Sequence, residues 1–87
     1  MTTSPQGDEA TLMGRALREL RERHGMTQKD LGEHIRCPGS YIERIEAGEV
    51  DPAFTTLGRL FRALGVDRRE LHEVETDIRA RDTAARS

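Results

Sequence analysis

The chain has 87 residues and a formal net charge of −2 at pH 7; 34% of its residues are hydrophobic, 34% are charged and only 3% are aromatic. A chain this short forms one domain with a thin core, which excludes a second catalytic lobe. So few aromatic residues suit a helical domain better than a β-sandwich or barrel, and we therefore predict an all-α fold.

The chain carries one cysteine, Cys37, which excludes an internal disulfide framework and fits a reducing compartment. No apolar run reaches the roughly 20 residues of a membrane span, and the N-terminus has no signal-type segment, so we expect a cytoplasmic protein. His24, His34 and Cys37 lack an accepted zinc spacing, and neither a glycine-rich phosphate loop nor a catalytic serine, histidine and carboxylate order is present. We expect no metal, no cofactor and no enzymatic activity.

The first predicted helix spans about residues 9–24. Residues 1–8 ahead of it have the composition of a disordered arm. Apolar residues then recur at helical spacing, and Gly25 follows as a left-handed terminator. This apolar stripe consists of Met13, Ala16, Leu17 and Leu20.

Two short helices separated by about three residues come next, a spacing that is typical of a helix-turn-helix. Thr27 can cap the first of them by accepting the Asp30 amide, and Gly32 in its middle permits close approach of the next helix. Pro38 prevents this helix from continuing, because it lacks the N–H donor and disfavours a helical conformation at Cys37. We expect Cys37 to fill the turn as a core residue.

The second short helix is predicted over about residues 38–47. Ser40 and Glu43 form a candidate capping box at its start, and Gly48 ends it. Its inward residues are Ile42 and Ile45. Its other face can protrude from the domain with polar side chains along one edge, a shape that fits the DNA major groove.

A fourth helix is predicted over residues 54–65, because Phe54, Leu57, Leu60, Phe61 and Leu64 again repeat with helical spacing. Asp67 and Glu70 then repeat the capping pattern and start a fifth helix. Its apolar residues, Leu71, Val74 and Ile78, could pack on the first helix or form a dimer seam. We predict a domain over residues 9–78 and a C-terminal tail over residues 79–87.

Several motifs agree with one known family. They are Leu17–Gln28 (LRELRERHGMTQ), Leu31, Ile42–Gly48 (IERIEAG), Asp51-Pro52, Thr56-Leu57 and Arg62–Val66 (RALGV). The chain resembles the Xre/Cro-type helix-turn-helix regulators over about residues 12–72. The resemblance implies a compact five-helix, lambda-repressor-like domain that binds double-stranded DNA, commonly as a homodimer, in a transcription regulator, phage repressor or antitoxin.

The resemblance also assigns the groove-facing positions of the recognition helix. They are Gly39, Ser40, Tyr41 and Arg44. Arg44 is the best candidate for reading a base, because its planar fork can make two hydrogen bonds to guanine. An ordinary solvated helix residue, or an intramolecular partner of Glu43 or Asp30, is the alternative interpretation of Arg44.

Gln28 matches the position at which the family holds a phosphate, and helix N-termini attract anions on physical grounds as well. Plain capping is the alternative interpretation of Gln28. The resemblance further pairs Arg21 of the first helix with Glu46 of the recognition helix. We assign this pair to structure, because bidentate geometry would fix the angle between the two helices against a desolvation cost.

The sequence departs from the family pattern in two places. Arg36 stands where the family usually has glycine, so we expect a locally different turn, since left-handed backbone costs a non-glycine residue roughly 1 kcal/mol or more. Glu49 stands where the family often has a basic residue. Between Gln28 and Asp51, three basic residues stand against six acidic ones, which gives this unit a charge of −3.

Two functional hypotheses follow. The first is a sequence-specific DNA-binding transcription regulator that reads the major groove with residues 38–47, as a homodimer with its recognition helices about 34 Å apart on a pseudopalindromic operator. The second is a protein-interaction module of the same fold, for instance an antitoxin, whose acidic surface or C-terminal helix binds a toxin or another regulator.

Overall fold

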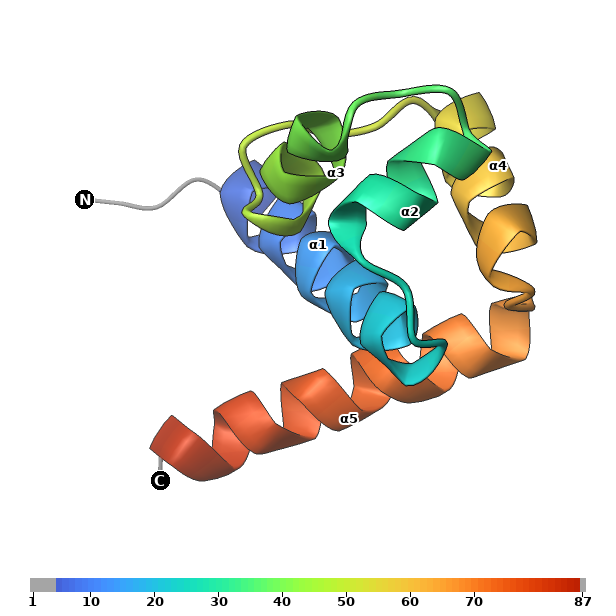
Figure 1. Ribbon diagram of the computed structural model, residues 1–87. Helices are drawn as coiled ribbons and strands as arrows, with labels where there is room; N and C mark the ends of the chain where they lie inside the picture. The colour runs from blue at the N-terminus through green and yellow to red at the C-terminus, as the bar shows by residue number, and fades with distance from the viewer. Residues whose placement is uncertain (1–4, 87) are drawn as a thin grey trace.

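Five α-helices and no β-strand are found in residues 5–86, the part of the chain that the computed structural model describes. In chain order the helices are α1 (Pro5–Arg23), α2 (Gln28–His34), α3 (Gly39–Glu46), α4 (Phe54–Leu64) and α5 (Arg68–Arg86), as Figure 1 shows. Side chains are described over residues 12–85. The predicted all-α class and the order of its five helices are confirmed.

One apolar cluster joins the five helices. Its fully or almost fully buried members are Ala16, Leu17, Leu20, Leu31, Ile35, Ile42, Ile45, Leu60, Leu64, Val66, Val74 and Ile78. Burying a side chain of this size contributes about 1.5–3 kcal/mol, so this cluster is the main source of stability. Phe54 shares the predicted helical repeat of α4 but is 89% exposed, because it stands at the first residue of that helix, outside the cluster.

The turn between α2 and α3 is built on close backbone contacts. The Cys37 N–H donates to the Gly32 carbonyl oxygen at 2.8 Å. A Cβ atom on Gly32 would lie 2.5 Å from the Cys37 carbonyl oxygen, so glycine is required here by the turn. Arg36 has a φ of 61°. The expected change in the turn is therefore wrong: Arg36 adopts the left-handed conformation itself, at the energetic cost of a non-glycine residue there.

α3 begins at Gly39, two residues earlier than a cap at Ser40 would allow. Pro38 occupies the N-cap position, and no side chain caps the helix there. The predicted capping box of Ser40 and Glu43 is therefore wrong, since Ser40 already lies inside the first turn. By contrast, the box at α2 forms: the Asp30 N–H donates to Thr27 Oγ1 at 2.9 Å, and the Thr27 N–H donates to Asp30 Oδ2 at 3.1 Å.

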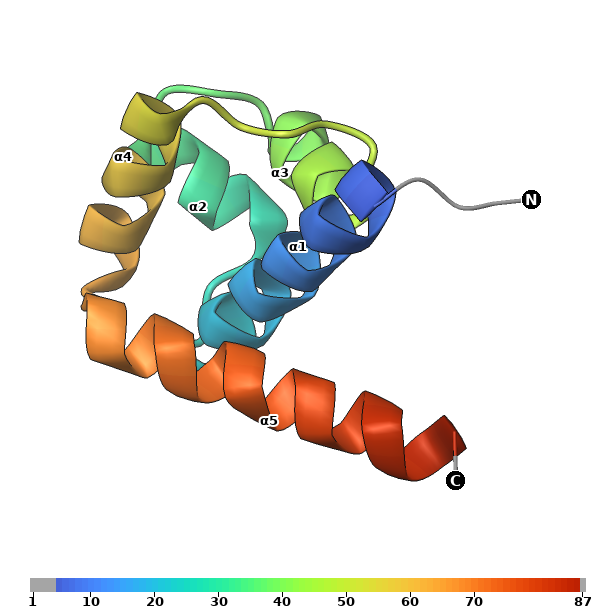
Figure 2. The same cartoon turned by 180° about the vertical axis from the view of Figure 1, so that it is seen from behind.

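Both terminal helices are longer than predicted. α1 begins at Pro5, a residue that suits the first helical position, rather than at residue 9. Of the predicted arm, residues 1–4 lie outside the described residues. α5 continues to Arg86, so the predicted tail is helical over most of its length. In the views of Figures 1 and 2, α5 crosses beside α1, and ion pairs described below join the two helices.

The two interpretations of the apolar residues on α5 can now be separated. Val74 and Ile78 are fully buried and pack into the core, so they are not available for a dimer seam. Leu71 is half-buried and only packs against the edge of the core. A seam on this helix would therefore have to use Leu71 and its surroundings.

Two further observations concern the described residues only. None of their helices is both long and apolar enough to cross a lipid bilayer. Among the same residues, no three histidine, cysteine or carboxylate side chains come together in a way that could hold a metal ion. Cys37 is a free thiol, half-buried against the core, in agreement with its predicted place in the turn.

Candidate nucleic-acid interface

α3 is anchored on one side and open on the other. Ile42 and Ile45 are buried in the core, which fixes the helix by its apolar face. On the open side, Ser40 and Arg44 are exposed, whereas Gly39 and Tyr41 are half-buried. Ser40 and Arg44 are thus accessible on the open side of α3, Tyr41 is partly covered, and Gly39 lies against α2.

Arg44 projects from the last turn of α3 into solvent. It forms an ion pair with Glu49, with 3.7 Å between Arg44 Nε and Glu49 Oε1, and the two side chains are 61% and 64% exposed. Of the intramolecular partners considered from sequence, neither Glu43 nor Asp30 forms an ion pair with Arg44 among the described residues. The exposed contact with Glu49 leaves Arg44 accessible, because exposed pairs are worth only about 0–1 kcal/mol.

Arg21 and Glu46 form a buried, two-point ion pair between α1 and α3. Arg21 Nε donates to Glu46 Oε2 at 2.7 Å and Nη2 donates to Glu46 Oε1 at 3.1 Å. The two residues are 8% and 9% exposed. The hydrogen bonds to Glu46 raise the pKa of Arg21 above its usual value, more than burial lowers it. Arg21 Nη1 also donates to the Met26 carbonyl oxygen at 2.7 Å, so the pair ties the start of α2 as well.

Gln28 joins the same network, a contact that sequence reasoning did not predict. Its Nε2 donates to Glu46 Oε1 at 3.0 Å, and the side chain is half-buried. Since a side-chain amide nitrogen carries two N–H groups, this bond uses one of them. Gln28 therefore links the first turn of α2 to the end of α3, and capping alone does not describe it.

Glycines bring the three helices of this unit unusually close together. A Cβ atom on Gly14 would lie 2.4 Å from the Ile45 carbonyl oxygen, and one on Gly39 would lie 3.1 Å from the Lys29 Cα. The first contact sets α1 against the end of α3, and the second sets the start of α3 against α2. Gly14 was missed from the sequence, although a glycine inside an apolar helical stripe is a signal for such a contact.

The exposed charges of this unit are mostly negative. Five carboxylates are exposed between α2 and the start of the α3–α4 loop, namely Asp30, Glu33, Glu43, Glu49 and Asp51. Three cations are exposed over the same stretch, namely Lys29, Arg36 and Arg44. Burial of Glu46 against Arg21 therefore reduces the predicted excess of negative charge but does not remove it.

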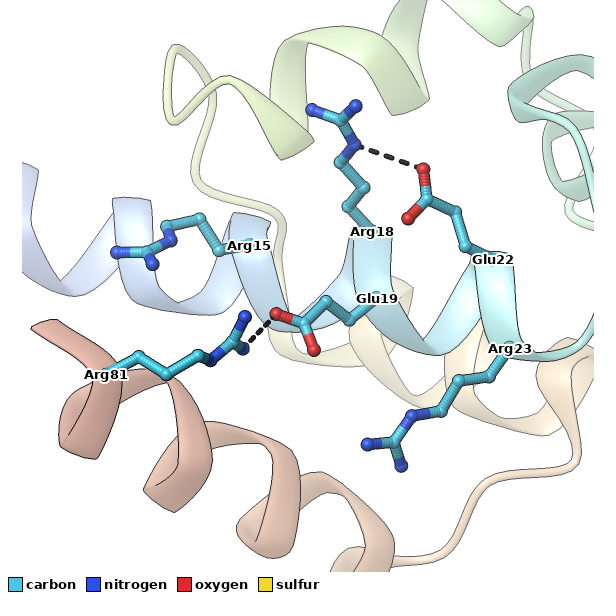
Figure 3. A pocket seen from close by; sticks show the side chains of 6 residues that line it. All are labelled: Arg15, Arg18, Glu19, Glu22, Arg23 and Arg81. Atoms are coloured by element: carbon cyan, nitrogen blue, oxygen red, sulfur yellow. Dashed lines mark hydrogen bonds and ion pairs between the residues drawn. The ribbon is translucent and has the colours of Figure 1, made fainter.

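Four arginines gather elsewhere, along α1 and α5, and three of them are paired with carboxylates of the protein. A pocket of about 620 Å³ is lined by five residues of α1 and one of α5, namely Arg15, Arg18, Glu19, Glu22, Arg23 and Arg81. Figure 3 shows these six side chains. Arg81 pairs with Glu19 and Arg18 with Glu22, and Arg15 Nη1 lies 2.7 Å from Asp82 Oδ2. The Arg18–Glu22 pair lies within α1, whereas the Arg15–Asp82 and Arg81–Glu19 pairs join α1 to α5 and explain why α5 continues past residue 78.

Comparison with known proteins places this geometry in a family. A family model described as a helix-turn-helix domain matches residues 12–74. Multiprotein-bridging factor 1 of Debaryomyces hansenii is 41% identical over 54 residues, which cover 62% of this chain and 36% of that protein. The chain thus spans little more than a third of the length of this curated relative.

Two solved structures are similar over most of their own length. The clp gene regulator ClgR from Corynebacterium glutamicum superposes with a TM-score of 0.79 and 25% identity, covering 88% of this chain and 82% of that one. The restriction-modification controller protein C.AhdI from Aeromonas hydrophila gives a TM-score of 0.69 and 30% identity, covering 74% and 97%. The chain therefore belongs to the helix-turn-helix domain family, and its structural relatives are consistent with the Xre type.

Proposed function

We propose that this protein is a sequence-specific DNA-binding transcription regulator that reads the major groove of double-stranded DNA with α3. One observation carries the proposal: α3 is fixed by its buried apolar face while Arg44, 61% exposed, projects from the opposite side. The regulators ClgR and C.AhdI share this arrangement of helices over most of their length, which supports the same class of function here.

The open face of α3 supplies suitable groups for base reading. The Arg44 guanidinium can donate two parallel hydrogen bonds to O6 and N7 of guanine, worth about 1–3 kcal/mol of discrimination against other bases. Ser40 can bond with several bases, and Tyr41 can reach a phosphate or a thymine methyl group. Gly39 contributes by its lack of a side chain, since it allows α3 to lie against Lys29 of α2.

Gln28 is proposed to act in phosphate contact rather than in base reading. Its amide has one N–H group left after the bond to Glu46. It lies in the first turn of α2, where a DNA phosphate can approach the helix-turn-helix. Phosphate contacts of this kind position the protein on the duplex without reading the base sequence.

The proposed homodimer uses the junction of α4 and α5. An apolar groove of about 460 Å³ lies there, lined by Met13, Phe54, Leu57, Gly58, Phe61, Arg68 and Leu71. Phe54 is 89% exposed beside it, an unusual position for a large apolar side chain. In a two-fold symmetric dimer, the groove of each copy would face the same residues of the other copy, so one surface patch would form both halves of the interface.

The experiment that tests the function compares two variants on a duplex selected by the wild-type protein. Arg44→Ala should remove the preference for this duplex over a scrambled one, because a base contact is lost. Gln28→Ala should weaken binding to both duplexes by a similar factor, because a phosphate contact is lost. Unchanged affinity and preference in both variants would reject the assignment.

The excess of exposed carboxylates favours a second candidate, a protein-interaction module such as an antitoxin. A surface with five exposed carboxylates and three cations between α2 and the α3–α4 loop attracts a basic partner more readily than DNA. In this case the purified protein would select no duplex motif but would co-purify in a defined ratio with a small basic toxin encoded beside it. A selected motif without a stoichiometric partner would reject this candidate.

A further inference from the structure

The backbone at the end of α3 holds Glu49 close to Arg44. Gly48 has a φ of 78°. The Gly48 N–H donates to the Ile45 carbonyl oxygen at 3.0 Å, and the Glu49 N–H donates to the Arg44 carbonyl oxygen at 2.9 Å. This pair of bonds is a common way for a left-handed glycine to close the last helical turn. The helix cap thus fixes the backbone of Glu49 beside the last turn of α3, within side-chain reach of Arg44.

The contact between the two side chains is made at one edge of the guanidinium. Arg44 Nε lies 3.7 Å from Glu49 Oε1. The two terminal nitrogens of the same group form the fork that recognises O6 and N7 of guanine. A carboxylate at Nε can therefore orient the guanidinium without occupying its base-reading end.

Helix stability does not account for a carboxylate at this place. The C-terminal end of a helix carries partial negative charge, which favours cations and disfavours carboxylates. Both side chains are more than 60% exposed, so their pairing contributes little to folding. The charge of Glu49 has its main consequence for whatever approaches Arg44.

We propose that Glu49 is a positioning residue that determines DNA specificity through Arg44; this inference rests on the proposed function. On a non-cognate duplex the available partner of Arg44 is a phosphate, and the neighbouring carboxylate repels that phosphate. On the cognate duplex Arg44 meets the neutral acceptors of guanine and keeps its contact with Glu49. Glu49 therefore weakens non-specific binding more than specific binding, and so widens the difference between them.

The test measures Kd for the selected and the scrambled duplex with wild-type protein, Glu49→Gln and Glu49→Asp. In Glu49→Gln, affinity for the scrambled duplex should rise about two- to fivefold, the range expected for an exposed charge pair. Affinity for the selected duplex should rise less, so the specificity ratio falls. Glu49→Asp keeps the charge and should keep a ratio close to that of the wild type.

One mutant background and one control variant distinguish an effect of Glu49 through Arg44 from a general effect of its charge. In an Arg44→Ala background, which has lost the preference between the duplexes, Glu49→Gln should raise affinity for the scrambled duplex by a smaller factor than it does when Arg44 is present. Glu33, an exposed carboxylate on α2, provides the control: Glu33→Gln removes the same charge and should leave the ratio unchanged.

The outcomes that contradict the inference are distinct from failure of the proposed function. A specificity ratio that stays the same or rises in Glu49→Gln would overturn the inference alone. So would a rise in affinity for the scrambled duplex that is as large in the Arg44→Ala background as it is when Arg44 is present. A wild-type protein with no preference for any duplex would reject the proposed function, and with it this role of Glu49.

Discussion

The ion pair between Arg21 and Glu46 adds a polar anchor for α3 to the packing of its apolar face. The two hydrogen bonds of the pair measure 2.7 Å and 3.1 Å, and Arg21 and Glu46 are only 8% and 9% exposed. Gln28 and the Met26 carbonyl complete the network. Truncating one partner leaves the other as an uncompensated buried charge, whereas replacing both with apolar residues removes the desolvation cost as well. The two kinds of substitution should therefore differ strongly.

Arg21→Met and Glu46→Leu are each expected to lower the free energy of unfolding by about 3–5 kcal/mol, a large part of the stability of a small domain. The double variant should lose clearly less than the sum of the two. Urea unfolding of the four proteins provides the double-mutant cycle. Purely additive losses would show that the two side chains do not stabilise one another.

Gly14 gives a second test, because glycine in a helix is usually less stable than alanine. Its Cβ would meet two backbone oxygens of α3, those of Ile45 and Glu46, at 2.4 Å and 2.8 Å. Gly14→Ala should thus destabilise the protein by about 1–3 kcal/mol, as overpacking does. Gly58 in α4 has open space around its Cβ position, so Gly58→Ala should stabilise by roughly 0.5–1 kcal/mol. Equal shifts of Tm in the two variants would refute the close contact at Gly14.

Several contacts of single residues could not be predicted from the sequence. Arg21 and Glu46 were paired because the family pattern implied it. The bond from Gln28 to Glu46 joins residues 18 positions apart, and it exists only once the helices are assembled. The contact of Glu49 with Arg44 depends on the left-handed turn at Gly48. From the sequence, Gly48 indicates only the end of the helix.

Among the helices, α2 is the one with the clearest local signal. It is seven residues long, too short to be stable alone, and its capping box is predicted and observed. The N–H of Thr27 donates to the Asp30 carboxylate, and this bond is the main reason why the pKa of Asp30 lies below its usual value. A lowered pKa in the folded state means that the charged carboxylate stabilises the fold above the ordinary carboxyl pKa, and that this contribution is lost as pH falls.

The pH dependence of Asp30→Ala checks this sign. The difference in Tm between wild type and variant should be largest near pH 6. It should shrink as pH falls below the ordinary carboxyl pKa of about 4 and through the lowered pKa of Asp30 in the folded protein. Asp51→Ala, which removes an exposed carboxylate from the α3–α4 loop, should show a smaller change of its Tm difference over the same range. A difference for Asp30→Ala that is the same at both ends of the range would contradict the contribution of the charged form.

The lengths of the terminal helices were harder to predict than their existence. Periodic apolar residues locate α1, α4 and the first half of α5, because local spacing reports burial. The last two turns of α5 contain few apolar residues and read as a tail. They are joined to α1 by Arg15–Asp82 and Arg81–Glu19, pairs between residues more than 60 positions apart in the sequence.

The proposed function requires two copies of the protein to assemble on a pseudopalindromic site. Phe54→Ser should shift the protein toward the monomer in sedimentation velocity, because it removes the most exposed apolar side chain of the α4–α5 groove. It should also weaken operator binding without changing which bases are preferred. Ala80→Ser, an exposed position on α5 outside the groove, is the control. A Phe54→Ser protein that sediments as the wild type does would place the dimer interface elsewhere.

Selection of random duplexes by the purified wild-type protein, followed by binding at several salt concentrations, tests the central claim most directly. We predict a recovered half-site that occurs twice in inverted orientation, contains a guanine whose preference is lost in Arg44→Ala, and is bound with an affinity that falls steeply as salt rises. Recovery of no motif, with weak binding that is indifferent to sequence, would contradict the claim that α3 reads DNA.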